Sequence, residues 1–303
     1  MAEARSYQQK DREVLLSLMA EAYGEQAGEA HFDGLISGSV GIWLASSSEG
    51  GPAEGFCRLV QDEETRARRR ACMDLLFVQD GKPRLELGRA LIDAVRAEAA
   101  QKGLDGVWGY FTDPLGRDFL RSTEGEKLRD IRLYRREKLD ELSPPQPPEG
   151  YQLRSLSVPD DLEYAAALYN DTFLGMWNFR PHSPEDIAAW FEGRETTPED
   201  CLILESGGED TGEAEGGGIA VLAVDPERVE RSDLTAYVPD IGVTPAHRRQ
   251  GLGRVLMTAI AERARSRGLT AIELIADDED PAAKNFYRSL GFDEMGKITV
   301  YEW

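Results

Sequence analysis

The stretch Val238–Met257, which reads VPDIGVTPAHRRQGLGRVLM, decides the fold of this chain. Its β-rich apolar run, Ile241–Val243, ends at a Thr-Pro pair and is followed by a basic, glycine-rich loop at Arg248–Gly253. From Leu252 onward, apolar residues recur at the spacing of one helix face. Backbone N–H groups and the positive end of a helix dipole converge at such a loop, and glycines let the backbone come close to a ligand. The stretch therefore predicts an α/β unit whose loop binds a pyrophosphate.

The spelling of the loop separates it from two other anion-binding motifs. A P-loop requires Gly-Lys-Ser/Thr at its end, and this loop has neither Lys nor Ser/Thr there. A dinucleotide-binding fold requires Gly-x-Gly-x-x-Gly early in a βαβ unit, with an acidic residue about 20 residues further on. The loop instead reads Arg-x-x-Gly-x-Gly from Arg248 to Gly253, which disfavours a nucleotide-binding kinase.

This spelling resembles the acyl-CoA pyrophosphate signature of the GNAT superfamily of N-acyltransferases. Val243–Pro245 precedes the loop as in that family, and Tyr287-x-x-x-Gly-Phe downstream resembles the family's closing element. The resemblance covers residues 151–303, about half of the chain. It implies a mixed α/β fold, with a central mixed β-sheet flanked by helices, and acetyl-CoA as co-substrate.

By the same resemblance, the residues of the loop bind the phosphates of acetyl-CoA. In the family, the strand before the loop splays from its neighbour, and its free backbone groups bind the pantetheine arm and polarise the thioester carbonyl. Ile241 and Val243 stand at that position. The expected phosphate contacts are Arg248, Arg249, Gln250, Gly251, Leu252, Gly253 and Arg254.

Composition favours a cytoplasmic protein of two domains. A chain of 303 residues is long for one hydrophobic core. The N-terminal residues lack an apolar signal core, and the apolar runs are too short to cross a membrane. The three cysteines are scattered and show no metal-ligand spacing, so we expect reduced thiols and no zinc.

The net charge of −21 argues against nucleic acid or an anionic membrane as a partner. Residues 150–303 carry 14 Lys/Arg and 29 Asp/Glu, so the half with the basic loop is the more acidic one. Acidic surroundings would suit a cationic amine substrate. A solubilising surface explains the same charge and is the better-supported interpretation.

An internal repeat indicates two tandem domains. Leu87–Leu91 matches Leu252–Leu256 at a shift of 165 residues, and the apolar helical spacing continues in the same order after both. A proline-rich stretch near the midpoint is a semi-rigid spacer. We therefore predict a GNAT-like domain at 1–142, a linker at 143–149 and a catalytic GNAT domain at 150–303.

The periodicity predicts the elements of both halves. In the first half, helices are expected near 10–23 and 87–102, and strands near 40–45, 55–60, 71–78 and 104–110. In the second half, strands are expected at 151–158, 201–205, 218–224, 234–243, 270–276 and about 296–303. Its helices are expected at about 159–173, from 183, at 252–267 and at 281–290.

The first copy has lost the chemistry of the loop. At the same shift, Arg248 corresponds to Pro83, which has no N–H to donate, and Gly251 corresponds to Glu86, whose carboxylate would repel a phosphate. Further on, Phe119–Ser122 matches Phe286–Ser289 at a shift of 167 residues, and there Leu120 stands where the second copy has Tyr287. We therefore expect a degenerate first domain and acyl-CoA binding in the second.

Three side chains of the second half are candidates for catalysis. An amine must be neutral before it attacks a thioester, so a general base is needed, and the departing thiolate needs a proton. Tyr287 stands where the family has the tyrosine that protonates the thiolate, although packing beneath its helix would also explain it. Asp240 and Glu273 are alternative general bases, and either carboxylate could instead be solvated or paired.

The acceptor cannot be named from the sequence. Trp177, Phe179, Arg180 and His182 lie where family members line the acceptor pocket, but an aromatic cluster there could equally be packing. We expect an N-acetyltransferase that acts on a primary amine of a small molecule or peptide. The alternative is an acyl-CoA-binding regulatory or interaction module without turnover.

Overall fold

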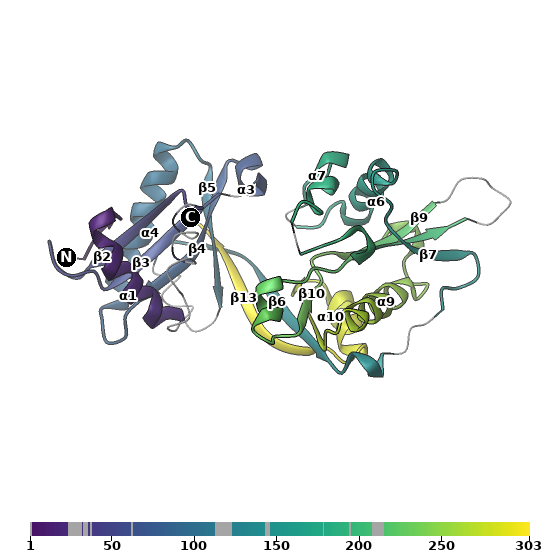
Figure 1. Ribbon diagram of the computed structural model, residues 1–303. Coiled ribbons are helices and arrows are strands. Elements are labelled where there is room, and N and C mark those ends of the chain that lie inside the picture. The colour runs from purple at the N-terminus through teal and green to yellow at the C-terminus, as the bar shows by residue number, and fades with distance from the viewer. Residues whose placement is uncertain are drawn as a thin grey trace. The chain divides into compact units, whose positions relative to one another are not determined.

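The computed structural model shows a mixed α/β protein that divides into two compact units (Figure 1). It describes residues 2–23, 32, 36, 38–61, 63–112, 123–142, 146–177, 179–193, 195–207 and 215–303. The first unit comprises residues up to Ile131 together with Lys297–Trp303, and the second comprises Arg132–Gly296. No helix in the described ranges is long and apolar enough to cross a membrane.

The first unit is a mixed sheet with helices. Its strands are β1 (Glu3–Ser6), β2 (Gly41–Ser46), β3 (Gly55–Val60), β4 (Arg70–Val78) and β5 (Gly106–Thr112). Its helices are α1 (Arg12–Tyr23), α3 (Glu63–Ala67) and α4 (Arg84–Gln101). β1 to β4 pair antiparallel in chain order, and β4 pairs parallel with β5. The apolar stripe Leu87, Leu91 and Val95 buries α4 against this sheet, as its spacing predicts.

The end of the chain completes the sheet of the first unit. The last part of β13 (Asp293–Glu302) pairs antiparallel with β5, from Ile298 opposite Thr112 to Glu302 opposite Trp108. The buried ring of Tyr301 joins the core of that unit. Residues about 200 positions apart in the sequence therefore share one sheet.

The second unit contains the stretch that decided the fold. Its strands are the later part of β6 (Glu126–Glu137), β7 (Tyr151–Ser155), β8 (Cys201–Ser206), β9 (Glu215–Val221), β10 (Thr235–Tyr237), β11 (Ile241–Val243), β12 (Ala271–Asp277) and the start of β13. Its helices are α6 (Leu162–Phe173), α7 (Pro184–Ala189), α8 (Pro226–Glu230), α9 (Leu252–Ser266) and α10 (Pro281–Ser289). Short 3-10 turns lie at Leu139–Glu141, Pro198–Asp200 and Pro245–His247.

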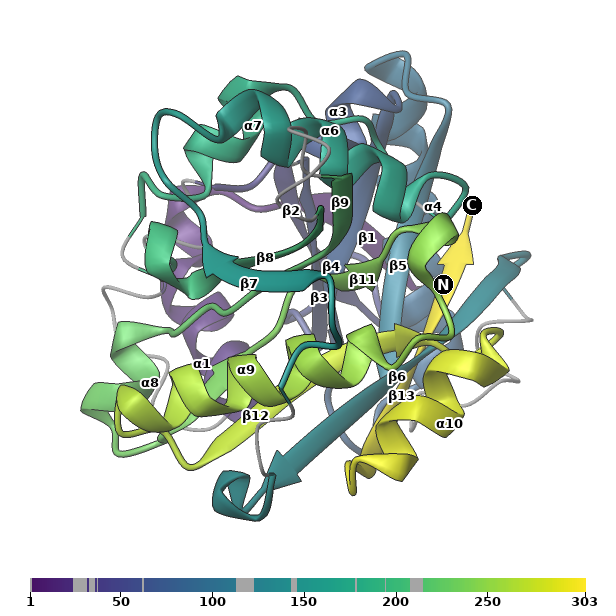
Figure 2. The same ribbon diagram turned by 90° about the vertical axis from the view of Figure 1, so that its right-hand side faces the viewer.

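Two helical layers cover opposite faces of the four-stranded sheet β7-β8-β9-β11 (Figure 2). Because side chains alternate along a strand, Ile203 and Ile219 pack beneath α6 and α7, whereas Leu204 and Ala220 face the other way, toward α9. This sheet, with α9 behind it, carries the basic loop.

The prediction of one strand over 234–243 was wrong. The chain forms β10, which pairs parallel with β12, and then β11, which pairs antiparallel with β9 in the other sheet. Pro239 interrupts the ladder because it has no N–H to donate. The N–H of Val238 donates to the Glu273 carbonyl, and the Asp240 carbonyl accepts from the N–H of Val221. Within three residues, the chain has therefore changed sheets.

The compact units do not divide at the predicted linker, 143–149, part of which lies outside the described residues. The division falls within β6, after Ile131. Tyr134, Leu139 and Leu142 are buried in the core of the second unit, with α9 and α10, although the prediction assigned them to the first domain. Residues 297–303 were assigned to the second domain and belong to the first unit.

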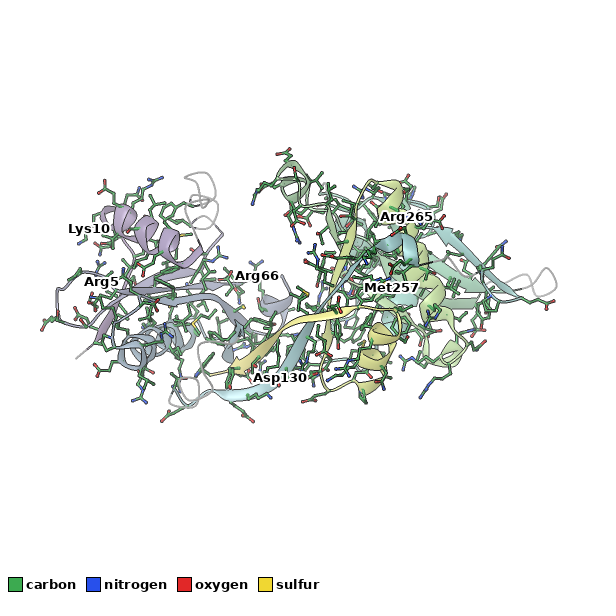
Figure 3. All side chains as sticks on the ribbon, turned by 90° about the horizontal axis from the view of Figure 1, so that it is seen from below. Arg5, Lys10, Arg66, Asp130, Met257 and Arg265 are labelled. Carbon is green, nitrogen blue, oxygen red and sulfur yellow. The ribbon has the colours of Figure 1, made fainter. Side chains whose placement is uncertain are left out.

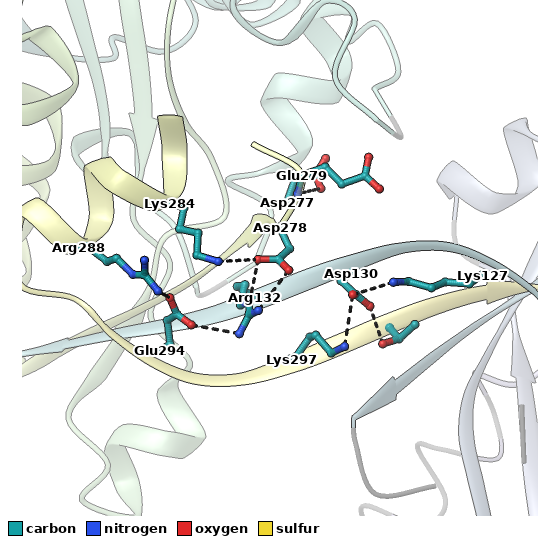
Figure 4. Close-up of polar contacts among 11 residues, drawn as sticks. Lys127, Asp130, Arg132, Asp277, Asp278, Glu279, Lys284, Arg288, Glu294 and Lys297 are labelled. Carbon is teal, nitrogen blue, oxygen red and sulfur yellow. Dashed lines mark hydrogen bonds and ion pairs between the residues drawn. The ribbon is translucent and has the colours of Figure 1, made fainter. Parts of the chain in front are cut away.

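Strand β6 was missed because most of its side chains are charged. In the second unit, Arg132 binds Asp278 at 2.8 Å and Glu294 at 3.1 Å (Figure 4). In the first unit, Asp130 accepts hydrogen bonds from Lys127 and Thr299. Partners far along the chain therefore stabilise a strand that looks like a solvated charge run in the sequence.

Candidate functional site

The basic loop has the backbone conformation of an anion-binding nest. Arg249 and Gly251 both have left-handed φ angles, 66° and 80°, and Gly251 is the N-cap of α9. A glycine N-cap has no side chain to accept from the first turn of the helix. The N–H groups of Gln250 to Gly253 consequently have no acceptor among the described residues. Unsatisfied N–H groups at the positive end of a helix form a site for an anion.

Helix α9 holds the loop rigidly. The residues Val255, Leu256, Met257 and Ile260 are almost fully buried, whereas Arg265 near the other end of the helix is exposed; Met257 and Arg265 are labelled in Figure 3. At Gly253, a Cβ would lie 3.4 Å from the ring of Phe286, so α9 and α10 approach closely at the mouth of the loop. The sequence prediction of an amphipathic helix after the loop is confirmed.

A cavity of about 710 Å³ opens at this mouth. Loop and α9 form one side of it, and the first turns of α10, with Pro281, Asn285 and Phe286, form the other. Six of the seven predicted phosphate contacts line it together with Val243, and these are Arg248, Arg249, Gly251, Leu252, Gly253 and Arg254. The seventh, Gln250, is not among the lining residues. The cavity is large enough for part of a cofactor-sized ligand.

The three arginines of the loop differ in their contacts. The Nε of Arg248 donates to the Val243 carbonyl at 3.0 Å, and an Nη of Arg254 donates to the Ser289 hydroxyl at 3.3 Å. Arg249 makes no hydrogen bond or ion pair with a described residue. All three are exposed, so the mouth of the cavity carries positive charge that is accessible to an anionic ligand.

A tyrosine and a histidine that sequence reasoning missed support the loop. The hydroxyl of Tyr151, on β7, lies 2.7 Å from Nδ1 of His247 and donates to Oε1 of Gln250 at 3.0 Å. Because that hydroxyl has only one proton, it accepts from Nδ1–H of His247. Gln250 is therefore fastened to β7 and does not turn into the cavity.

The edge of β11 that faces away from β9 has no paired strand in the part of the chain that the structure describes. Asp240 and Thr244 make their backbone hydrogen bonds toward β9. By the alternation of an antiparallel ladder, the N–H and C=O groups of Ile241 and Val243 point to the open edge. The Val243 carbonyl accepts from Arg248, so the remaining groups are available to a ligand that extends from the cavity.

Tyr287 lies on α10 and is packed on three sides. Its ring centroid lies 5.2 Å from those of Tyr134 and Phe286 and 5.7 Å from that of Phe292. Burial raises the pKa of its hydroxyl above the ordinary value, and nearby Asp280 raises it further. The hydroxyl has no hydrogen-bond partner among the described residues, so it remains protonated and can donate.

The two candidate bases have different surroundings. Burial raises the pKa of Asp240 above its usual range, and its Oδ1 accepts from the Tyr169 hydroxyl at 3.1 Å. Glu273, on β12, is held by two arginines, with Arg135 at 2.5 Å and Arg228 at 3.1 Å. Both oxygens of Glu273 are thus occupied by arginines, whereas Oδ2 of Asp240 has no donor among the residues that the structure describes.

Aromatic side chains surround Tyr169, on α6, which is the hydrogen-bond partner of Asp240. Tyr169 lies 4.3 Å from the ring of His182, 4.6 Å from that of Phe173 and 5.4 Å from that of Trp190. Of the residues expected there, His182 belongs to this cluster, and Arg180 is paired with Asp186 at 3.2 Å. Phe179 packs against the same hydrophobic core, and Trp177 lies in the loop after α6.

Asp280 caps α10. Its side chain accepts from the N–H groups of Ala282 and Ala283, at 2.8 and 3.2 Å. The carboxylate thereby satisfies two N–H groups of the first turn and complements the helix dipole.

This geometry agrees with the family comparison. Residues 131–292 match the model of the acetyltransferase (GNAT) family. The match covers more than half of the chain, so the chain belongs to this family and is an enzyme of the acyltransferase type. The matched segment begins in β6, one residue before the second unit.

Curated relatives include acyltransferases of two kinds. A mycothiol acetyltransferase from Thermobispora bispora is 28% identical over 221 residues, 71% of this chain and 71% of that protein. An L-amino acid N-acyltransferase from Escherichia coli is 28% identical over 135 residues, 44% of this chain and 74% of that protein. The first match is long enough to reach into both halves, as expected for a tandem member.

Solved structures share the tandem fold over the whole chain. A GCN5-related N-acetyltransferase from Sphaerobacter thermophilus has a TM-score of 0.73 at 17% identity, covering 100% of this chain and 95% of that one. A tandem GNAT protein from the clavulanic acid biosynthesis pathway has a TM-score of 0.66 at 16% identity, covering 100% and 98%. The predicted fold class, two tandem GNAT-like domains, is confirmed.

Proposed function

We propose that the protein transfers an acetyl group from acetyl-CoA to the primary amine of a small molecule, and that the second unit carries the reaction. The observation that carries this proposal is that the nest at Arg248–Gly253 lines the same cavity as Val243, on β11, which is the edge strand of its sheet. A pyrophosphate fits the nest by charge and by its need for N–H donors. An amide-containing arm fits the open strand edge because it can replace a missing strand.

Asp240 accepts the proton of the amine, directly or through one water. Burial raises the pKa of its carboxyl, which makes the carboxylate a stronger base than that of an exposed aspartate. The amine nitrogen then forms a bond to the thioester carbonyl carbon, and the carbon–sulfur bond breaks. Backbone N–H groups at the β11 edge stabilise the negative charge on the carbonyl oxygen.

Tyr287 donates its proton to the departing thiolate sulfur. Its neutral hydroxyl and fixed ring suit this role, because an interaction with the sulfur becomes strong only as the negative charge develops. Glu273 instead fixes β12 to its neighbours through its two arginine partners.

The first unit supplies the scaffold, without acyl-CoA binding of its own. In α4 the helix begins at Arg84 after Pro83 as N-cap, so Glu86 lies in the first turn. In α9 the corresponding Gly251 precedes the helix. A carboxylate in that turn opposes an anion where the second unit has a nest. The corresponding position of Tyr287, Leu120, lies outside the described residues.

An amine panel tests the proposal against the binding-module alternative. The panel contains free L-amino acids, L-methionine sulfoximine, an amino sugar and a short peptide, because relatives carry the names of amino-acid and methionine sulfoximine acetyltransferases. Thiol release and the mass of the acetylated product are measured. We expect turnover of at least one small amine. Tight acetyl-CoA binding without acetylated product across the panel would support the binding module.

A further inference from the structure

We propose that Tyr169 is a positioning residue that holds the carboxylate of Asp240 in a single orientation, leaving Oδ2 for the proton of the amine. The proposal rests on the proposed function, because the orientation of Asp240 matters for the reaction only if Asp240 is the general base. The Tyr169 hydroxyl donates to Oδ1 of Asp240 at 3.1 Å. A carboxylate whose one oxygen is occupied by a donor presents its other oxygen at a defined place.

The backbone fixes how α6 meets the strand that carries Asp240. At Gly242, a Cβ would lie 2.4 Å from Cγ2 of Thr172 and 3.0 Å from the ring of Phe173. Only glycine therefore allows this approach of α6 to β11. Asp240 and Gly242 face the same side of the strand, because they are two residues apart. Tyr169, one helical turn before Phe173, is thereby set above Asp240.

Packing around the ring leaves Tyr169 little freedom. Phe173, His182 and Trp190 contact it on three sides. His182 is itself fastened, because its backbone N–H donates to the Asn170 side chain and its carbonyl accepts from that same amide. Its Nδ1 lies 3.0 Å from the carbonyl oxygen of Arg180, which can only accept, so this nitrogen carries a proton. This packing fixes the direction in which the hydroxyl of Tyr169 points.

The electrostatic surroundings of Asp240 make this hydrogen bond important. Burial raises the pKa of the carboxyl, while the Tyr169 hydrogen bond and the nearby His182 lower it. The charge of Asp240 also helps to raise the pKa of Tyr237, to about 12, and that of buried Cys201, so both stay neutral at pH 7. Tyr169 is therefore the one side chain whose hydrogen bond to Asp240 the structure records among the described residues.

The test follows the titration of Asp240 in the full-length protein. The Cγ signal of ¹³C-labelled aspartate is assigned by its loss in Asp240→Asn. In Tyr169→Phe, we expect the pKa of Asp240 to rise by about one unit, which is a tenfold change in proton affinity. In Tyr164→Phe, a control on the same helix whose ring contacts Arg154 instead, it should not move. An unchanged pKa in Tyr169→Phe would overturn the proposal.

Kinetics then separate positioning from structure. With the best amine of the panel, Tyr169→Phe should lower kcat about tenfold and leave the KM for acetyl-CoA within twofold. Incorporation of 3-fluorotyrosine at position 169, which keeps the shape and strengthens the donor, should shift the pKa of Asp240 downward. If Tyr169→Phe does not fold, the fluorotyrosine variant tests the proposal instead, and an unchanged pKa of Asp240 in it would overturn the proposal. One outcome separates this proposal from the proposed function. If the pKa of Asp240 moves in Tyr169→Phe but Asp240→Asn keeps full activity, Asp240 is not the base and Tyr169 has no catalytic role. The acetyltransferase activity itself would still stand.

Discussion

The ring of Tyr134, on β6, lies 5.2 Å from the ring of Tyr287, the proposed acid on α10. Tyr134 is almost fully buried, and it precedes the proline-rich stretch by about ten residues of sequence. The segment before the predicted linker is therefore part of the core that supports the site. A GNAT domain that began after the linker would lack one of the three rings that pack against Tyr287.

We expect the second unit to fold as a fragment of residues 132–296 but not as 150–296. The shorter fragment loses Tyr134, Leu139 and Leu142, and each buried side chain of this size contributes about 1.5–3 kcal/mol by the removal of apolar surface from water. Circular dichroism and thermal melts of the two fragments check this. Equal, cooperative melting of both would show that β6 is dispensable to this core.

Substitution of Gly251 should weaken acetyl-CoA binding through the backbone alone. Its φ of 80° is left-handed, and a Cβ there would meet no atom within 4 Å, so an alanine costs about 1–2 kcal/mol of strain without a clash. Gly268, at the far end of α9, has a φ of 78° and equal space. We expect Gly251→Ala and Gly268→Ala to lose similar stability, while only Gly251→Ala raises the Kd for acetyl-CoA. If the two variants bind acetyl-CoA with equal affinity, the nest at Gly251 does not contribute to binding.

Tyr287→Phe keeps the packed ring and removes only the donor. We expect kcat to fall about 10-fold or more with little change in acetyl-CoA affinity, the pattern of an interaction made mainly in the transition state. Stopped-flow turnover together with calorimetry measures both quantities. Wild-type turnover under conditions where chemistry limits the rate would mean that Tyr287 only packs.

The ion pair of Arg132 with Asp278 should make stability depend on pH. Hydrogen bonding to Arg132 lowers the pKa of Asp278 below its ordinary value. The folded state therefore binds this proton less readily than the unfolded chain, so the pair stabilises above the ordinary aspartate pKa, and the stabilisation is lost as pH falls through the folded value.

We expect Arg132→Met to reduce the free energy of unfolding at pH 7 by about 1–3 kcal/mol, since the side chains of Arg132 and Asp278 are 26% and 19% exposed. The difference from wild type should shrink toward pH 2. Urea unfolding across this range measures it. A difference that stays constant with pH would mean that the alkyl stem of Arg132, rather than its charge, matters.

Short sequence patterns predicted most helices and strands, because the interactions that determine these elements lie between residues close together in the sequence. The apolar spacing after Gly251 and the Ser183-Pro184 start of α7 depend on neighbours within one turn, and the structure has the Ser183 hydroxyl accepting from the Asp186 N–H. The strand β6 depends on Asp278 and Glu294, which lie about 150 residues away. No window of sequence contains those partners.

The candidate site also has a part that the sequence predicts and a part that it does not. The phosphate loop could be predicted because strand, loop and helix are contiguous. The partners of Asp240 and Gln250, which are Tyr169 and Tyr151, come from elements some 70 to 100 positions earlier, and only the close approach of α6 at Gly242 brings the first pair together. In the sequence, Tyr169 is one more aromatic residue on an amphipathic helix.

The central claim is that acetyl-CoA binds once, at the nest of the second unit. Calorimetric titration of acetyl-CoA into the full-length chain tests it most directly. The titration compares wild type with Gly251→Glu, which introduces the carboxylate that the first copy has at the corresponding position, Glu86. We expect a stoichiometry of one site per chain in wild type and loss of that site in Gly251→Glu. Two sites per chain, or one site that survives Gly251→Glu with unchanged affinity, would contradict the account.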